Sequence, residues 1–335
     1  MGMTSRFNAI FEALDPRVQH RTRQRVDEVR DSTRELRRAM NLIEIRTEQL
    51  MLLERLNWEQ RAQTDALSQL LDPVSVRDHV NAAVDRAVLA DDPFPHFVVE
   101  NWLPPAVYDA MLKAIPPAVF FAEKPSHKQQ LHVPPPIAPE YSRRVWTFLA
   151  EHVVTECLGP AVVRKLGERV DAYVQSICPA SSDAWRQHVR MHASEGRLMV
   201  RRAGYLLEPH RDPRWGFITC LAYLARNSDT EIYGTRLYRV KHDQEAPDES
   251  VFYVDKKDCE LVSTVPFRAN HLLVFLNSAG AHGASIPDDA PPDLERYMYQ
   301  FRMGPDLKGI RWLLERMPEA HRHLWAGLKT GRAGY

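Results

Sequence analysis

The sequence lacks a charge excess of either sign. Its 335 residues contain 44 Lys and Arg against 44 Asp and Glu, so the formal net charge at pH 7 is zero. A protein that binds nucleic acid over much of its surface normally carries a basic excess. The balance argues against such a surface over the whole molecule, and we expect no nucleic-acid partner.

Long apolar runs are also absent. No stretch approaches the roughly 18 to 20 consecutive apolar residues that span a bilayer, and the N-terminus lacks the short apolar core of a signal peptide. We therefore expect a cytoplasmic protein without a membrane span. The cysteines show no CxxC spacing, which suggests neither a zinc ribbon nor a disulfide scaffold and favours reduced, mostly buried thiols. They are Cys157, Cys178, Cys220 and Cys259.

Three familiar sequence motifs are missing as well. The phosphate-binding patterns GxxxxGK[ST] and GxGxxG do not occur, which removes the standard nucleotide loops. His188 and His192 lie four apart in a predicted helix, but Val189 stands where the HExxH motif has glutamate. This argues against a zinc metalloprotease and favours surface histidines.

Glycine and proline are missing from the N-terminal part. After Gly2 the next glycine is Gly159, and no proline lies between Pro16 and Pro73. This absence predicts a helical segment within residues 1–90. Its apolar residues form two irregular stripes, so we favour a helical hairpin or a helix packed on a partner over a long dimeric coiled coil. Homo-oligomerisation through these helices is a further expectation. The stripes are Leu36, Met40, Ile43, Leu50 and Leu53, then Leu42, Ile45, Leu52 and Leu56.

Residues 91–305 are expected to form one domain, followed by a helical tail at 306–335. Helices are predicted at about 105–115, 141–157 and 161–176. Strand-like runs then follow at 198–207, 217–224, 235–240, 251–254, 261–265, 271–277 and 296–303. Short strands separated by turn residues are typical of a sandwich or barrel. The sequence therefore predicts an α+β fold with a jelly-roll core at about residues 195–305.

Two histidines and one acid stand out in the strand region. His210 and Asp212 are two apart in an extended run, where alternate side chains share a face, and His282 follows the apolar run 271–276. About one His-x-Asp is expected by chance, so that pair alone is weak evidence. Two histidines and a carboxylate are the facial triad typical of non-haem Fe(II), although zinc binds the same residue types.

An arginine opens the last strand-like run. Alternation places Tyr297, Tyr299 and Phe301 on one face, suited to packing on helices, and Arg296, Met298, Gln300 and Arg302 on the other. An inward guanidinium needs an anion, and its planar fork fits a carboxylate. An arginine at a water-facing strand edge is the alternative, and Arg302 is the second candidate for the anion.

Taken in order, five segments resemble the Fe(II)- and 2-oxoglutarate-dependent dioxygenases, in particular the prolyl 4-hydroxylase-like branch. They are His210-Arg211-Asp212, 219–224, 234–238, 272–275 with His282, and Arg296-Tyr297. The resemblance covers residues 92–305 and implies a double-stranded β-helix core with supporting helices. It implies that His210, Asp212 and His282 bind iron and that Arg296 pairs with the distal carboxylate of 2-oxoglutarate. Tyr223 matches a tyrosine that helps to hold this carboxylate in some members, and a core tyrosine is its alternative role.

The resemblance also implies the reaction. 2-Oxoglutarate and O2 are consumed, a substrate is hydroxylated, and succinate and CO2 are released. Retained Asp212 favours hydroxylation over halogenation. The alternative is a non-catalytic jelly-roll protein that binds a sugar or peptide and uses its N-terminal helices for assembly.

The substrate is not identified by the sequence. We expect a small-molecule or sugar-type substrate rather than a protein. A basic and aromatic entrance is one hypothesis for its recognition, formed by His132, Arg143, Arg144, Arg190, Arg214 and Trp215.

Overall fold

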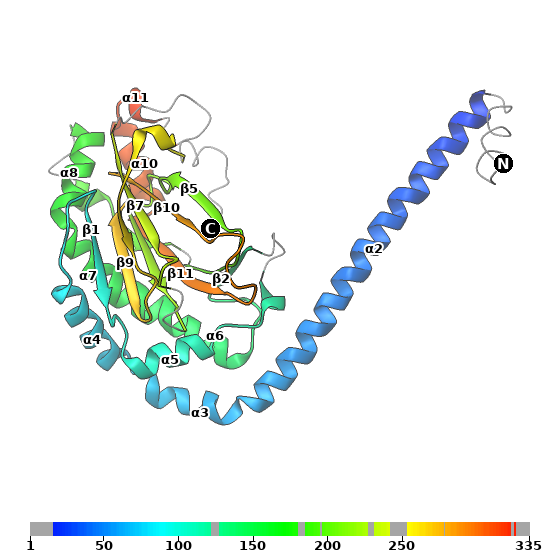
Figure 1. Cartoon of the computed structure of the whole chain (residues 1–335), viewed down its shortest axis with the longest axis horizontal. Helices are drawn as coiled ribbons and strands as arrows, with labels where there is room; N and C mark the ends of the chain where they lie inside the picture. Colours follow the sequence, from blue (N-terminus) through cyan, green and yellow to red (C-terminus); the bar gives the residue numbers. More distant parts are fainter. Residues whose placement is uncertain are drawn as a thin grey trace. The chain divides into compact units, whose positions relative to one another are not determined.

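The computed structural model describes residues 16–121, 127–179, 185–194, 196–226, 231–241, 253–277, 279–322 and 325. The chain divides into two compact units, Met1–Arg55 and Leu56–Tyr335. Most of helix α2 (Pro16–Glu59) belongs to the first unit (Figure 1). The helix is continuous through both apolar stripes, so no hairpin turn lies within them. Its residues Leu36, Met40, Ile43 and Leu50 are exposed, and their association with a partner or a second copy stays a prediction.

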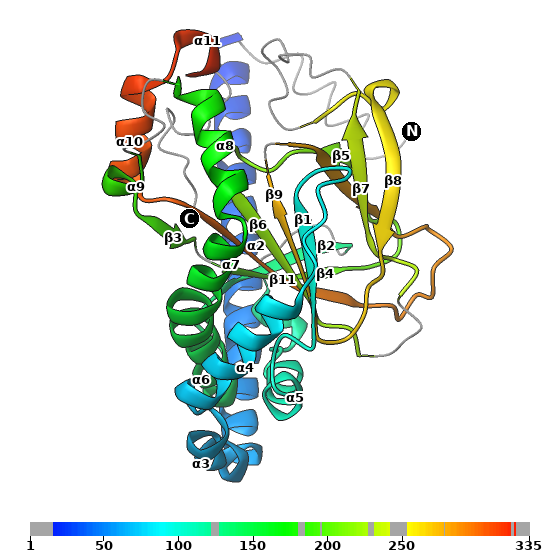
Figure 2. The ribbon, with the colours of Figure 1, turned by 90° about the vertical axis from the view of Figure 1, so that its left-hand side faces the viewer.

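Two antiparallel sheets form the centre of the second unit (Figures 1 and 2). The larger sheet has the order β1-β9-β6-β11-β4-β2, and β3 also pairs with β11. The smaller sheet has the order β5-β10-β7-β8. The strands are β1 (His96–Glu100), β2 (Lys128–Val133), β3 (Met191–Ala193), β4 (Gly196–Arg201), β5 (Leu206–His210), β6 (Ile218–Tyr223), β7 (Thr235–Val240), β8 (Cys259–Val265), β9 (His271–Leu276), β10 (Ala281–Ser285) and β11 (Arg296–Pro305).

The two sheets pack face to face. One apolar cluster joins Leu237 and Val265 of the smaller sheet to Leu221, Phe275 and Met298 of the larger one. Because side chains alternate along each strand, residues on the other face of the larger sheet form a second, larger core with the helices.

Helices cover that other face of the larger sheet (Figure 2). They are α3 (Arg61–Leu70), α4 (Pro73–Arg86), α5 (Pro105–Lys113), α6 (Glu140–Phe148), the π-helical η2 (Leu149–Leu158), α7 (Gly159–Lys165), α8 (Gly167–Ile177), α9 (Trp185–His188) and α10 (Leu307–Arg316). The short helices η1 (Ala118–Phe120), η5 (Lys256–Asp258) and α11 (Glu319–Arg322) complete the described elements. The predicted α+β class is confirmed by this arrangement of antiparallel sheets and helices.

The alternation predicted for β11 is confirmed. Tyr299 packs on Trp146 of α6, with ring centroids 5.3 Å apart, whereas Arg296 and Arg302 point between the sheets. The thiol prediction also holds, because Cys157, Cys178 and Cys220 are buried and free and Cys259 is free and partly buried.

Some predicted elements differ from the structure. The run 198–207 is two strands, β4 and β5, because Gly204 adopts a positive φ of 78° and turns the chain between them. His188 and His192 do not share a helix, because α9 ends at His188 and His192 lies in β3. Residues 251–252 of the run 251–254 lie outside the described part.

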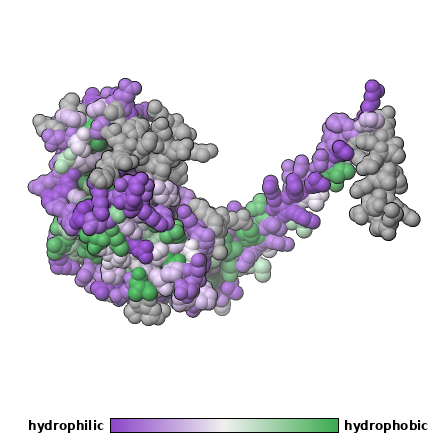
Figure 3. Space-filling view, turned by 45° about the horizontal axis from the view of Figure 1, so that its top comes forward, coloured by the Kyte–Doolittle hydropathy of each residue, from purple (hydrophilic) through white to green (hydrophobic). Residues whose placement is uncertain are grey.

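The surface that Figure 3 shows is mostly hydrophilic, with scattered apolar residues. Within the described ranges, no helix is both long enough and apolar enough to cross a membrane.

Candidate functional site

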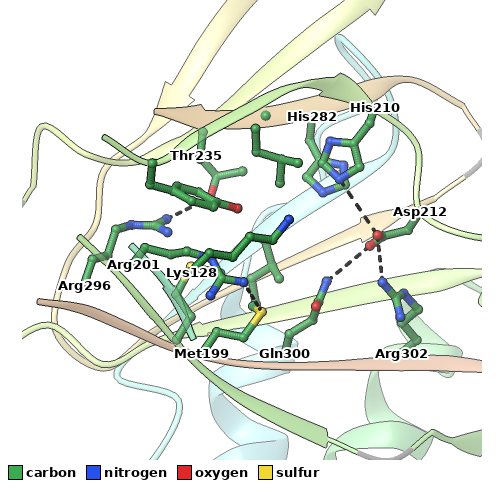
Figure 4. A pocket seen from close by; sticks show the side chains of 16 residues that line it. Lys128, Met199, Arg201, His210, Asp212, Thr235, His282, Arg296, Gln300 and Arg302 are labelled. Atoms are coloured by element: carbon green, nitrogen blue, oxygen red, sulfur yellow. Dashed lines mark hydrogen bonds and ion pairs between the residues drawn. The ribbon is translucent and has the colours of Figure 1, made fainter. Parts of the chain in front are cut away.

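A cavity of about 110 Å³ lies between the two sheets (Figure 4). The smaller sheet contributes Leu207, His210, Thr235, His282, Gly283 and Ala284 to its lining. The larger sheet contributes Lys128, Met199, Arg201, Leu221, Arg296, Met298, Gln300 and Arg302, and loops add Tyr205 and Asp212. Four of the five predicted site residues therefore line one cavity, and the fifth, Tyr223, does not.

Strand pairing brings the two histidines and the acid together. His210 ends β5 and lies directly opposite His282 of β10, and Asp212 follows His210 by two residues. The imidazole centroids of the histidines are 4.1 Å apart, and Nε2 of His210 lies 4.0 Å from Oδ1 of Asp212. One ligand atom of each residue lies within 4.8 Å of the others. Three donors this close can bind one metal ion after small side-chain rotations.

Hydrogen bonding at His210 and burial at His282 suit the two imidazoles to binding a metal ion. Nδ1 of His210 lies 3.0 Å from the carbonyl oxygen of Glu208. Because a carbonyl only accepts, Nδ1 donates its proton there, so Nε2 is the ring nitrogen that is left to bind a metal ion. Burial lowers the pKa of His282 to about 3, so this ring is neutral at pH 7.

Three side chains hold the carboxylate of Asp212. Nη2 of Arg302 donates to its Oδ1 at 2.7 Å, Oγ1 of Thr219 donates to its Oδ2 at 2.7 Å, and Nε2 of Gln300 donates more weakly at 3.4 Å. Burial alone would raise the pKa of Asp212, but the charge of Arg302 and the hydrogen bond that it donates hold this pKa well below its usual range. The carboxylate is therefore ionised and oriented before any ligand binds.

Asn277 fixes the loop that carries Asp212. Its Oδ1 accepts from the backbone N–H of Asp212 at 2.8 Å, and its Nδ2 donates to the carbonyls of Pro213 at 2.8 Å and Gly216 at 3.2 Å. The side chain is buried immediately after β9. Asn277 thus ties the segment between β5 and β6 to the larger sheet.

Arg296 lies at the opposite end of the cavity from the three candidate ligands (Figure 4). It is 1% exposed, its guanidinium lies 4.5 Å from the ring centroid of Phe267, and its Nε has no hydrogen-bond partner within the described ranges. Burial lowers the pKa of Arg296 to about 10, and no carboxylate is among the described groups that act on it. A buried guanidinium without a carboxylate is complementary to an anionic ligand in the cavity.

Tyr223 lies behind Thr235. Its hydroxyl donates to Oγ1 of Thr235 at 2.8 Å, and Nη2 of Arg296 donates to the same oxygen at 3.4 Å. With both donors pointing at it, the Thr235 hydroxyl keeps its own hydrogen to donate into the cavity. A direct contact between Tyr223 and a bound carboxylate stays a prediction, because Thr235 lies between the Tyr223 hydroxyl and the cavity.

Several residues of the site were missed by the sequence analysis. Thr219, Thr235 and Asn277 lie within or next to predicted strands, but only strand pairing shows which polar groups they meet. Arg302 was the second candidate for the anion, and the structure pairs it with Asp212 instead. Lys128 and Arg201 also line the cavity. Arg201 lies within the predicted run 198–207, where residue alternation alone does not show which side chains meet in the cavity.

The predicted entrance does not coincide with the cavity lining. None of its residues is among the described residues that line the cavity, and the hypothesis that they surround its mouth stays a prediction. Arg144, for example, pairs with Glu140 within α6 at 2.6 Å. The residues concerned are His132, Arg143, Arg144, Arg190, Arg214 and Trp215.

Comparison with known proteins finds structural likenesses but no sequence match. No protein-family description and no curated protein matches the chain. HygX from Streptomyces hygroscopicus, solved with nickel and 2-oxoglutarate bound, matches at 14% identity over 63% of this chain and 83% of its own, with a TM-score of 0.39. The non-haem α-ketoglutarate-dependent epimerase SnoN from nogalamycin biosynthesis matches at 14% identity over 74% and 91%, with a TM-score of 0.40. A prolyl-4-hydroxylase from Pseudomonas putida matches at 14% identity over 68% and 99%, with a TM-score of 0.38.

Proposed function

We propose that this chain is an Fe(II)- and 2-oxoglutarate-dependent oxygenase that hydroxylates a small molecule and releases succinate and CO2. One observation carries the proposal: a single cavity holds a His-Asp-His donor set at one end and a buried guanidinium without a carboxylate at the other. The donor set leaves metal positions open for a bidentate ligand and for O2. 2-Oxoglutarate has a chelating end for the metal and a distal carboxylate for the arginine.

Each side chain has a defined task in this proposal. His210, His282 and Asp212 hold the iron, and Arg302 and Thr219 keep the Asp212 carboxylate in place. Arg296 and Thr235 bind the distal carboxylate, and Tyr223 orients Thr235. Bound iron and 2-oxoglutarate supply the oxidising chemistry that no side chain of the cavity provides. The apolar wall formed by Leu207, Leu221 and Met298 limits the access of water.

The proposed function also implies a double-stranded β-helix fold. The double-stranded β-helix that we infer is supported by two antiparallel sheets that face each other with the site between them. A non-catalytic protein that binds a sugar or peptide would leave the buried donor set and the buried Arg296 without a role. A zinc hydrolase would account for the three ligands but not for Arg296.

The metal ligands are tested by spectroscopy. Anaerobic addition of Fe(II) and 2-oxoglutarate to the purified chain is expected to give a visible charge-transfer band, which His210→Ala and Asp212→Ala should abolish. His152→Ala, which removes an exposed histidine of η2, is the control and should keep the band. An unchanged band in either ligand variant would contradict the assignment. A wild-type chain that releases no succinate from 2-oxoglutarate with any substrate would contradict the reaction.

The cosubstrate contact is tested by affinity. Arg296→Met should raise the Kd of 2-oxoglutarate tens-fold, because a lost charge-assisted pair costs about 2 to 3 kcal/mol. Fe(II) affinity should stay the same, since Arg296 lies away from the three ligands. Arg169→Met, which removes a surface arginine of α8, is the matched control. Equal 2-oxoglutarate affinity in wild type and Arg296→Met would remove Arg296 from the cosubstrate site.

A further inference from the structure

Two more cations line the cavity, and the proposed reaction gives neither of them a partner. Lys128 of β2 lies opposite Arg201 of β4, and Arg201 lies opposite Arg296 of β11. Cross-strand partners project to the same face of a sheet, and all three side chains line the cavity. Three positive side chains therefore cross three neighbouring strands in one row (Figure 4).

Arg201 is a buried cation without a counter-ion among the described residues. It is 4% exposed, and its Nε has no hydrogen-bond partner. Nη1 donates to the carbonyls of Gln129 and Val200, but Nη2 donates only to the sulfur of Met199, a weak acceptor. The adjacent Arg202 points elsewhere and pairs with Glu295 at 2.6 Å. The charge of Arg201 also acts unfavourably on Arg296, so the two guanidinium groups are close neighbours.

Charge balance shows what the cavity still requires. Among the residues that the structure describes, its lining holds four cations, Lys128, Arg201, Arg296 and Arg302, against one carboxylate, Asp212. Asp212 balances Arg302, and the two positive charges of Fe(II) balance the two negative charges of 2-oxoglutarate. Positive charge therefore remains when metal and cosubstrate are both bound. Burying uncompensated charge is costly, so a further anion in the cavity would be favourable.

We propose that Arg201 and Lys128 bind a carboxylate or phosphoryl group on the substrate that is oxidised. The inference rests on the proposed function and narrows its substrate class from small molecules in general to organic anions. The planar fork of Arg201 suits two-point contact with either group, and Lys128 adds a mobile point charge.

The positions of Arg201 and Lys128 also indicate how a bound substrate would be oriented relative to the metal ligands. Figure 4 shows the Lys128 side chain crossing the cavity, with its amino end on the side where His210, Asp212 and His282 lie. Arg201 is buried, whereas Lys128 is exposed. An anion held between them would leave the remainder of the substrate near the metal ligands.

The test measures two affinities in the full chain loaded with Mn(II), a redox-inactive substitute for Fe(II). The first is the Kd of 2-oxoglutarate. The second, at saturating 2-oxoglutarate, is the Kd of inorganic phosphate and of acetate, with glycerol and acetamide as uncharged controls. Arg201→Met should raise the Kd of the anion that binds by about ten-fold to a hundred-fold, the range for one lost charge-assisted contact. Lys128→Met should raise it by a smaller factor, and both variants should keep the 2-oxoglutarate Kd within two-fold.

Phosphate and acetate distinguish the two anionic groups, and Arg201→Lys tests whether the charge alone suffices. The exposed Lys128→Met keeps the proposal testable if the buried Arg201→Met does not fold. A tens-fold rise in the 2-oxoglutarate Kd of Arg201→Met, with anion binding unchanged, would assign Arg201 to the cosubstrate and overturn the proposal while leaving the proposed function intact. Anion binding that is absent in wild type, or equal in wild type and both variants, would also overturn it. Failure of the Fe(II) band in wild type is a separate result that contradicts the proposed function itself.

Discussion

Arg296 and Arg302 lie on the same face of β11, but their surroundings give them different chemistry. Arg302 meets the carboxylate of Asp212 at 2.7 Å, so its charge is balanced within the protein. The guanidinium of Arg296 contacts a threonine and two aromatic rings, which do not balance its charge. It is therefore complementary to an anionic ligand. Residue type and strand face were visible in the sequence, but the partner of each guanidinium was not.

The pair between Arg302 and Asp212 should matter for stability. Arg302→Met leaves a buried carboxylate without its counter-charge, which typically costs about 3 to 5 kcal/mol. We expect the free energy of unfolding, measured with urea in the presence of EDTA, to fall by about that amount. Arg302→Lys should lose less because it keeps the charge. Gln300→Ala, which removes only the 3.4 Å contact, is the control and should change stability little. A stable Arg302→Met variant would show that Asp212 does not depend on this partner.

At the scale of elements, the pairing of β5 with β10 creates the donor set. This pairing places His282 opposite His210, and the segment after β5 carries Asp212. Both histidines were visible in the sequence, but β10 was not predicted, because Ala281–Ser285 consists mostly of small residues without a strand-like pattern. The alternation of β11 was predicted correctly because one face is aromatic and the other polar.

The loop between β5 and β6 should depend on Asn277. Asn277→Ala removes one acceptor and two donors that hold residues 212–216, so the Asp212 carboxylate loses its fixed position. We expect Fe(II) affinity to fall by about ten-fold to a hundred-fold, as is typical when a group that orients a metal ligand is lost. Asn57→Ala, which removes an asparagine that caps α6, is a control and should bind Fe(II) like wild type. Unaltered Fe(II) affinity in Asn277→Ala would mean that the loop holds its shape without this side chain.

At the scale of the whole molecule, the site joins the two sheets. The donor set lies at β5 and β10 of the smaller sheet, while Arg296, Arg201 and Lys128 lie on the larger one. A ligand that spans the cavity therefore contacts both sheets. The net charge of zero is compatible with a strongly positive cavity because the opposite charges are distributed over the rest of the chain.

Ligand binding should therefore stabilise the folded protein. A ligand that binds only the folded state at about 100 times its Kd adds about 2.7 kcal/mol. Mn(II) together with 2-oxoglutarate is expected to raise the Tm by several degrees, measured by differential scanning fluorimetry, and EDTA should reverse the metal-dependent part. Asp212→Ala should lose this metal response. A wild-type Tm that is indifferent to both ligands would argue against the site.

The sequence by itself determined the class of fold, the inward face of β11 and four of the residues that meet in the cavity. It did so because periodicity and residue type act locally along the chain. Only the tertiary structure decided that Arg302 balances Asp212, that Thr235 lies between Tyr223 and Arg296, and that Lys128 and Arg201 extend the row of cations. The physical reason is register: which side chains meet across a sheet depends on how strands far apart in sequence are aligned, and a shift of one residue turns every side chain to the other face.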